Sequence, residues 1–177
     1  MRHNPTMASS WLDRRIPLDM QRYAEESRTR CFICALRDDE PGFEHHVVLE
    51  TADAIAFLAK YPAVYGHVLV APRAHREGVI ADFTEPEYLG LQRVVRRVGE
   101  AVQKVVQCER LYVLSLGSQA ANAHVHWHLV PCPPGLPYEM QQVNLLLVDR
   151  DGYVDVSFEE MAVLASTLRG AVEDVAR

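Results

Sequence analysis

The chain has 177 residues, of which 49% are hydrophobic and 24% are charged, and its formal net charge at pH 7 is −6. These values are typical of one globular domain with short additions and exclude a mainly disordered chain. The absence of a dense lysine and arginine cluster argues against long nucleic acid as a partner. Because no apolar run reaches the roughly 20 residues that span a bilayer, and residues 1–25 lack the apolar core of a secretory signal, we expect a cytoplasmic protein without a membrane segment.

The first predicted elements are a short helix and three strands. Residues 1–30 are expected to form an N-terminal arm, in which Pro17 favours a short helix over residues 17–26. Short apolar runs separated by turn residues follow, and this pattern is typical of β-strands. The three runs are at residues 47–49, 54–58 and 67–71.

The middle and end of the chain predict two helices. Thr84 and Glu87 match the capping box that opens many helices, and apolar residues then recur at helical spacing as far as Val105. We therefore expect an amphipathic helix of about two dozen residues. Ser157 and Glu160 repeat the capping box before a C-terminal helix. Strands are predicted at residues 111–114 and 124–130, and a proline-rich loop at residues 131–137.

Strands on both sides of one long helix, joined by short connections, favour an antiparallel α+β domain over alternating βαβ units. The sheet should contain about five strands, with the long helix and the C-terminal helix packed on it. The expected organisation is an N-terminal arm at residues 1–30, a main domain at residues 31–140, and a C-terminal extension at residues 141–177 with a strand and a helix.

Three histidines alternate with apolar residues in the run from His124 to Val130. Successive side chains of a strand point to opposite faces, so the three imidazoles should share one face while the apolar side chains anchor the other face in the core. Strict alternation disfavours a polar face that contains histidines by chance. A three-histidine zinc site is also disfavoured, because side chains on one strand face diverge too little to surround one ion. A phosphate or metal site therefore includes part of this run.

The His-x-His-x-His pattern followed by two apolar residues resembles the signature of the histidine-triad (HIT) family. Further resemblance lies in Cys31–Cys34, residues 56–58 and residues 66–75, which follow in the family's order, so the resemblance extends from Cys31 to Pro131. It implies a HIT-like fold, a homodimer and nucleotidyl transfer, in which the central histidine attacks an α-phosphate and a covalent nucleotidyl-histidine forms.

Carried onto this chain, the resemblance makes His126 the nucleophile and His128 a donor to phosphate oxygens or to the leaving group. Chemistry agrees, because a neutral imidazole is nucleophilic at pH 7 without a strong base. The loop at residues 117–122 lies between two predicted strands, so we expect it to offer amides and polar side chains to the phosphate, although an ordinary hairpin loop is the alternative. The predicted substrate-binding residues are Ser115, Gly117, Ser118, Gln119, Asn122 and His67.

Cys31 and Cys34 have the Cys-x-x-Cys spacing, which in a cytosolic protein indicates metal or redox chemistry rather than a disulfide. The resemblance implies a structural zinc ion that His75 and His124 complete. The alternative is a pair of reduced, partly buried thiols. Cys108 and Cys132 are expected to take no part.

Several positions depart from the family pattern and bear on the substrate, among them Ala59 and Ser115. Ala59 stands where many members carry an Asp or Asn that holds the ribose, and Ser115 stands where Asn or Gln is usual. We consider three functions: a hydrolase of phosphorus-linked nucleotides such as dinucleoside polyphosphates or nucleoside phosphoramidates, a related transferase or phosphorylase, and a non-catalytic nucleotide-binding protein. The intact His126 favours an enzyme.

The apolar positions of the long helix span more than one narrow stripe, so we expect part of this surface to contact a second copy of the chain. In a family-like dimer, residues 133–142 would approach the partner's site and help to select the substrate. The alternative is a monomer in which the N-terminal arm covers the helix.

Overall fold

A computed structural model describes residues 11–119 and 121–175 of the chain. The first ten residues of the predicted arm and Ala120 of the predicted substrate loop lie outside the described residues. The described helices are α2 (Met20–Thr29), α3 (Phe32–Arg37), α4 (Glu85–Val105), α5 (Val148–Asp151) and α6 (Phe158–Val175), with short 3-10 helices at Leu12–Arg14, Tyr138–Met140 and Gln142–Leu146.

One antiparallel sheet of five strands forms the centre of the fold, in the order β2-β3-β4-β6-β5. This arrangement confirms the predicted α+β class. The long helix and the C-terminal helix begin where the two capping boxes predict them, directly after Thr84 and Ser157. The strands are β2 (Val47–Glu50), β3 (Ala54–Leu58), β4 (Val68–Pro72), β5 (Arg110–Ser115) and β6 (Trp127–Cys132).

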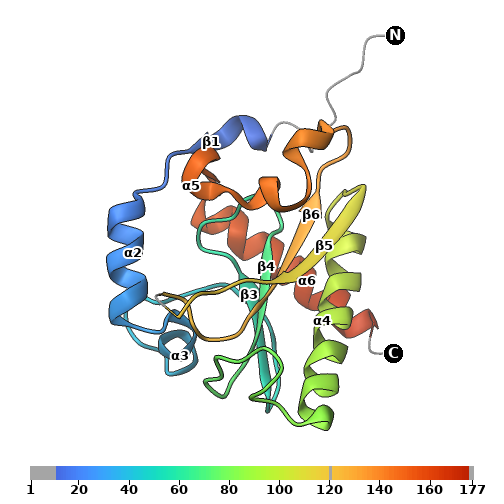
Figure 1. Cartoon of the computed structure of the whole chain (residues 1–177). Helices are drawn as coiled ribbons and strands as arrows, with labels where there is room; N and C mark the ends of the chain where they lie inside the picture. Colours follow the sequence, from blue (N-terminus) through green and yellow to red (C-terminus); the bar gives the residue numbers. More distant parts are fainter. Residues whose placement is uncertain (1–10, 120, 176–177) are drawn as a thin grey trace.

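The two faces of the sheet have different partners (Figure 1). Helices α4 and α6 pack against each other and against one face. On the other face, Phe57 of β3 and Leu69 of β4 form a second hydrophobic cluster with Ile33 of α3. This face is also where the site lies. None of the helices in the described ranges is both long and apolar enough to cross a membrane.

The histidine run follows the predicted alternation, although its strand is shorter than expected. Val125, Trp127 and Leu129 are buried in the core beneath α4, and this anchors the run. The strand begins only at Trp127 and continues to Cys132, so the proline-rich loop was predicted two residues too early. Pro131 is tolerated because β4 pairs with β6 only as far as Leu129, which leaves Pro131 with a strand on one side.

The ends of the chain pack together beside the main sheet. Strand β1 (Arg15–Ile16) pairs antiparallel with β7 (Tyr153–Val154), so the N-terminal arm is attached to the C-terminal extension. Gly152 makes this approach possible: its φ is +77°, and a Cβ atom there would lie 2.3 Å from the Ile16 carbonyl oxygen. Helix α2 follows β1 and is capped by Asp19, whose side chain accepts a hydrogen bond from the Arg22 amide.

Candidate active site and metal cluster

His126 is buried and held in one tautomer by the backbone. Its Nδ1 lies 2.8 Å from the His124 carbonyl oxygen, and because a carbonyl can only accept, Nδ1 carries the proton. The Nε2 atom of the neutral ring is therefore left with a free lone pair. The peptide of His126 is held as well, since the Ser115 hydroxyl on the neighbouring strand donates to the His126 carbonyl oxygen over 2.8 Å.

His128 is oriented by a chain of hydrogen bonds that begins at a backbone amide. The Ala63 amide donates to His67 Nδ1 over 3.3 Å, so the proton of neutral His67 is on Nε2. That Nε2 lies 3.0 Å from His128 Nδ1 and donates to it. His128 must then carry its own proton on Nε2. The rings of His126 and His128 lie 4.8 Å apart between centroids, so a lone pair and a donor are side by side.

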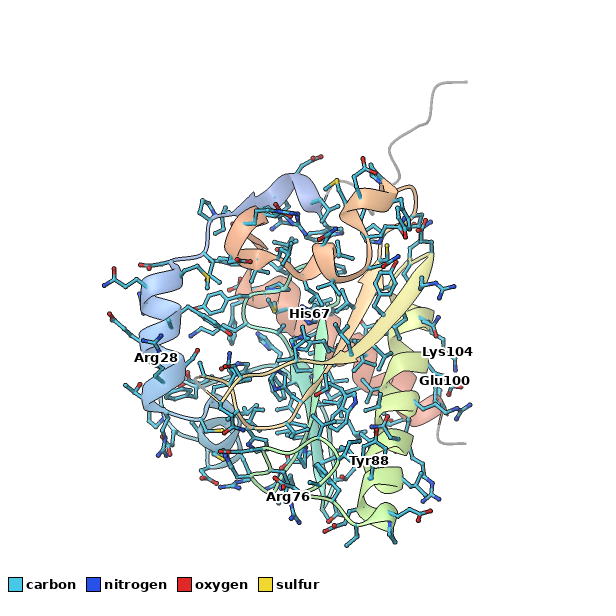
Figure 2. All side chains as sticks on the ribbon, in the orientation of Figure 1. Arg28, His67, Arg76, Tyr88, Glu100 and Lys104 are labelled. Atoms are coloured by element: carbon cyan, nitrogen blue, oxygen red, sulfur yellow. The ribbon has the colours of Figure 1, made fainter. Side chains whose placement is uncertain are left out.

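Burial keeps these rings neutral. Burial lowers the pKa of His126, and it lowers the pKa of His128 and His67 further. For His128 and His67, repulsion from a proton on a neighbouring histidine is the second cause. All three imidazoles are consequently uncharged at pH 7, as the hydrogen-bond pattern requires. Figure 2 shows His67 near the centre of the molecule.

The histidines face a cavity of about 180 Å³. Phe32 of α3 and Leu69 of β4 give the cavity an apolar wall. The Phe32 ring packs edge-on against the His126 ring, with 6.0 Å between the ring centroids. Helix α2 forms a second wall through Tyr23, Glu26 and Ser27, and Arg30 adds to this wall directly after the helix ends. The cavity is thus built from the sheet, from the arm and from the C-terminal extension, which contributes Leu146 and Val148.

Of the six predicted substrate-binding residues, Asn122 and His67 line this cavity. Asn122 donates from Nδ2 to the Tyr23 hydroxyl over 2.7 Å and so connects the loop to α2. Ser115 contacts the His126 backbone instead. The other three lie along the loop: Gly117 packs closely under the Asn122 carbonyl, Ser118 exchanges backbone hydrogen bonds with Ala121, and Gln119 lines a neighbouring hollow together with Cys31.

Several cavity residues were missed from the sequence. Phe32 had a signal, since it lies inside the Cys-x-x-Cys segment. Tyr23, Lys60, Leu146 and Val148 had none, because they come from separate segments that meet only after folding.

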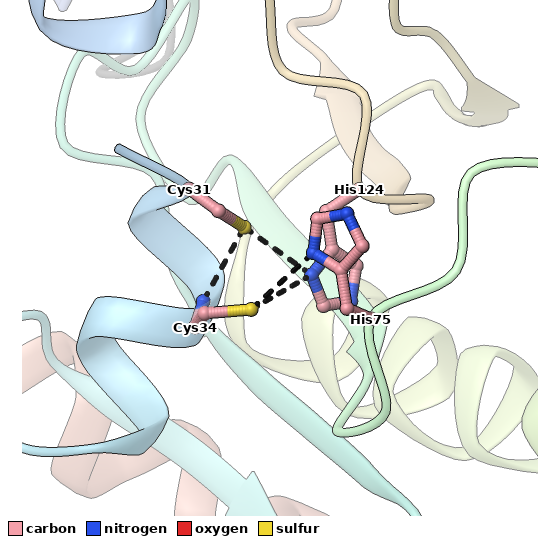
Figure 3. A group of neighbouring side chains, drawn as sticks. All are labelled: Cys31, Cys34, His75 and His124. Carbon is pink, nitrogen blue, oxygen red and sulfur yellow. Dashed lines mark hydrogen bonds between the residues drawn. The ribbon is translucent and has the colours of Figure 1, made fainter. Parts of the chain in front are cut away.

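The four predicted metal ligands come together in one cluster (Figure 3). One candidate ligand atom from each of Cys31, Cys34, His75 and His124 lies within 4.8 Å of the others. Both histidines turn Nδ1 toward the sulfur atoms. Cys31 Sγ lies 3.3 Å from His124 Nδ1, and Cys34 Sγ lies 3.3 Å from His75 Nδ1. The four cysteines of the chain are all free thiols, and Cys108 and Cys132 lie outside the cluster.

The geometry of the cluster fits a tetrahedral zinc ion. Bonds of about 2.3 Å to sulfur and about 2.1 Å to nitrogen separate these atoms by about 3.6 Å at tetrahedral angles, close to the distances present. The opposite ring nitrogens are already engaged: His124 Nε2 donates to the Pro72 carbonyl over 2.9 Å, and His75 Nε2 donates to the Glu77 carboxylate over 3.1 Å. Burial and the neighbouring Cys31 raise the pKa of the metal-free Cys34 thiol to about 11, so a bound metal would displace its proton.

Comparison with known proteins agrees with this geometry. The family model described as the HIT domain matches residues 40–134. An uncharacterized HIT-like protein of Saccharolobus solfataricus is 31% identical over 105 residues, which are 57% of this chain and 73% of the relative.

Solved structures share the fold. A hypothetical histidine triad nucleotide-binding protein of Sulfolobus tokodaii superimposes with a TM-score of 0.67 at 25% identity, covering 83% of this chain and 95% of that one. A zinc-bound histidine triad family protein of Mycobacterium smegmatis gives a TM-score of 0.62 at 20% identity, covering 84% and 97%. Because the HIT domain model matches residues 40–134, more than half of the chain, and solved structures share the fold, the chain belongs to the HIT family.

Proposed function

We propose that the protein is a nucleotide hydrolase that acts on phosphorus-linked nucleotides through a covalent nucleotidyl-His126 intermediate. The observation that carries this proposal is the fixed tautomer of His126, which leaves the Nε2 lone pair unprotonated beside the cavity. Membership of the HIT family supports nucleotide processing in general. The neighbouring Nε2–H of His128 supplies a donor for a phosphoryl oxygen.

In the first step the Nε2 lone pair of His126 attacks phosphorus and forms a P–N bond. The bond from phosphorus to the leaving nitrogen or oxygen breaks, its electron pair goes to the leaving atom, and a water molecule supplies the proton that this atom needs. His128 keeps its proton and stabilises charge on the phosphoryl oxygens. The His126 ring becomes positively charged in the intermediate, and its Nδ1–H bond to the His124 carbonyl stabilises that charge.

In the second step the hydroxide left by that water attacks phosphorus. The P–N bond to His126 breaks, its electron pair returns to Nε2, and a nucleoside monophosphate leaves. One water molecule is therefore consumed, with its proton on the leaving group and its hydroxide on phosphorus. A transferase or phosphorylase of the same family would share the first step and use another acceptor in the second.

The substitution His126→Ala should abolish formation of the adduct and reduce turnover by about a hundredfold or more, because no other group supplies the nucleophile. The measurement is intact-protein mass spectrometry after incubation with adenylated and guanylated substrates. His46→Ala, a histidine outside the cavity, is the matched control. Activity of His126→Ala above a tenth of the parent's would contradict the assignment.

The pH dependence of adduct formation should reflect the buried imidazole. The neutral ring is the nucleophile, and burial lowers the pKa of His126, so its protonation and the loss of rate move to lower pH. With a nucleoside 5′-(4-nitrophenyl) phosphate, whose charge is constant in this range, the rate should fall to half below about pH 6.5, the ordinary histidine pKa. A midpoint at or above that value would show that burial does not act as described.

We also propose that Cys31, Cys34, His75 and His124 hold a structural zinc ion. When bound, zinc supplies a cross-link between α3 and the start of the histidine run, and no step of the reaction uses it. The His124 side chain would help to hold the ion while the His124 carbonyl accepts the hydrogen bond from His126, so the cross-link would support the site indirectly. We also propose that the protein is cytoplasmic, because the cytosol keeps cysteine thiols such as these reduced.

Protein purified without chelator should contain about one zinc ion per chain by elemental analysis. Cys34→Ser should lose most of this zinc and melt lower by about 5 °C or more, whereas Cys108→Ser, outside the cluster, should keep it. Parent protein that contains no zinc would contradict the proposed zinc site.

We propose a homodimer, with a different surface from the one that α4 first suggested. Helix α6 packs along α4 and covers part of that surface, while α2 of the arm lies on the other side of the molecule (Figure 1). Strand β5 is an edge strand of the sheet, and Val113 in it and Leu116 after it are 48% and 44% exposed. A second copy that pairs along β5 would satisfy the free backbone edge of this strand and lie next to Val113, close to Leu116, which also lines the cavity.

Sedimentation at micromolar concentration should give twice the chain mass of 20.0 kDa. Val113→Asp should shift the population toward one chain, because two carboxylates would meet near the two-fold axis. Val163→Asp, at an exposed position of α6, is the matched control. A parent protein that sediments as a single chain would overturn the dimer.

A further inference from the structure

The cavity has two apolar ends that belong to different parts of the fold. At the α3 end, Phe32, Ala59 and Leu69 pack into the hydrophobic cluster on that face of the sheet. At the α5 end, Leu146 packs into a separate cluster, and Val148 lies two residues further along the chain. Helix α2, which contributes Tyr23, Glu26 and Ser27 to the cavity lining, runs between α5 and α3 (Figure 1), so the two apolar ends lie near opposite ends of this helix.

The arm is attached at the α5 end. Arg15 donates to the Leu145 carbonyl, just before α5, over 3.4 Å and lies 3.7 Å from the carboxylate of Asp151, the last residue of α5. This attachment brings Leu18, three residues later, to the cavity wall together with Leu146 and Val148. We call these three side chains the outer subsite. All three lie outside the residues that match the HIT domain.

The two catalytic histidines are distributed between the ends. His126 faces the α3 end, where its ring contacts Phe32. His128 of β6 lies opposite Leu114 of the neighbouring strand β5, and Leu114 packs in the same hydrophobic cluster as Leu146. A phosphorus atom attacked by His126 would therefore have its nucleoside toward the α3 end and its leaving group toward His128 and the outer subsite.

The charges in the cavity do not suit a long polyphosphate. Three of its described lining side chains are charged, and two of them are already paired: Glu26 with Arg22 over 2.8 Å, and Arg30 with Glu40 over 2.9 Å. Among the described lining residues, Lys60 is the cation without an ion pair. A polyphosphate leaving group would bring several negative charges, which proteins bind with clusters of arginine and lysine. The outer subsite offers only aliphatic side chains.

We propose that the outer subsite binds the leaving group and that this group is uncharged and apolar, such as an aryl alcohol or arylalkyl amine joined to the nucleotide phosphorus. This inference rests on the proposed function and selects one substrate class for it. The leaving atom takes the electron pair of its bond to phosphorus and a proton from water, as in the general mechanism. Substrate choice then depends on the arm and the C-terminal extension, because both build the subsite.

The test compares three nucleotides with the same nucleoside: a 5′-phosphoramidate of phenethylamine, one of 2-methoxyethylamine, and a dinucleoside tetraphosphate. The parent protein should hydrolyse the phenethylamine compound with kcat/KM about tenfold or more above the methoxyethylamine compound, since apolar pockets discriminate by this order. The tetraphosphate should be the poorest substrate.

Val148→Lys should remove the preference between the two amidates, mainly by lowering kcat/KM for the apolar one. Leu18→Lys, from another segment, gives a second reading if the first variant fails to fold. Val143→Lys, on the same extension but 58% exposed and outside the cavity, should keep the preference. Folding of each variant is checked by its thermal melting.

The possible results distinguish a failure of the outer subsite from a failure of the proposed hydrolase function. Equal rates on the two amidates, a tetraphosphate that reacts fastest, or variants that slow both amidates equally would overturn the outer subsite while leaving the hydrolase standing. Absence of any adduct on His126 with all three nucleotides would overturn the proposed function itself and the subsite with it.

Discussion

The hydrogen bond from His126 Nδ1 to the His124 carbonyl is the interaction on which the site depends. Without it, the neutral ring could place its proton on either nitrogen, and the tautomer with Nε2–H has its lone pair on Nδ1, not on the Nε2 atom that we propose as the nucleophile. The bond contributes only about 1 kcal/mol to stability, so its importance lies in the tautomer that it selects. It works because His124 is itself fixed, with Nε2 bound to the Pro72 carbonyl and Nδ1 turned to the cysteines.

Packing on both faces of the sheet holds this bond in place. Val125, Trp127 and Leu129 are buried beneath α4, which fixes the histidine run from one side. On the other side, the matched domain provides His126, the nucleophile that we propose, but the arm and the C-terminal extension provide α2 and α5 along the cavity. The domain therefore carries the chemistry that we propose, and the added segments shape the space in which a substrate would lie.

Much of the fold could be predicted because it follows local patterns. The alternation of Val125, Trp127 and Leu129 indicated the buried face, and Thr84 marked the start of α4. The cluster of Cys31 with His75 and His124 could be named only through the family resemblance, since spacing within a chain does not determine distance in space. The role of α2 could not be predicted from the sequence. Tyr23 contacts Asn122 although the two are ninety-nine positions apart, and the pairing of β1 with β7 holds the arm in this place.

The most direct test of the account is to determine the tautomers of His126, His128 and His67 by long-range ¹H–¹⁵N correlation NMR on protein labelled at the imidazole nitrogens. At pH 7, His126 should show a protonated Nδ1 and an unprotonated Nε2, while His128 and His67 should show the opposite tautomer. This pattern should persist below the ordinary histidine pKa, because burial lowers the pKa of all three rings. A His126 ring protonated at Nε2, or a positively charged ring at pH 7, would contradict it.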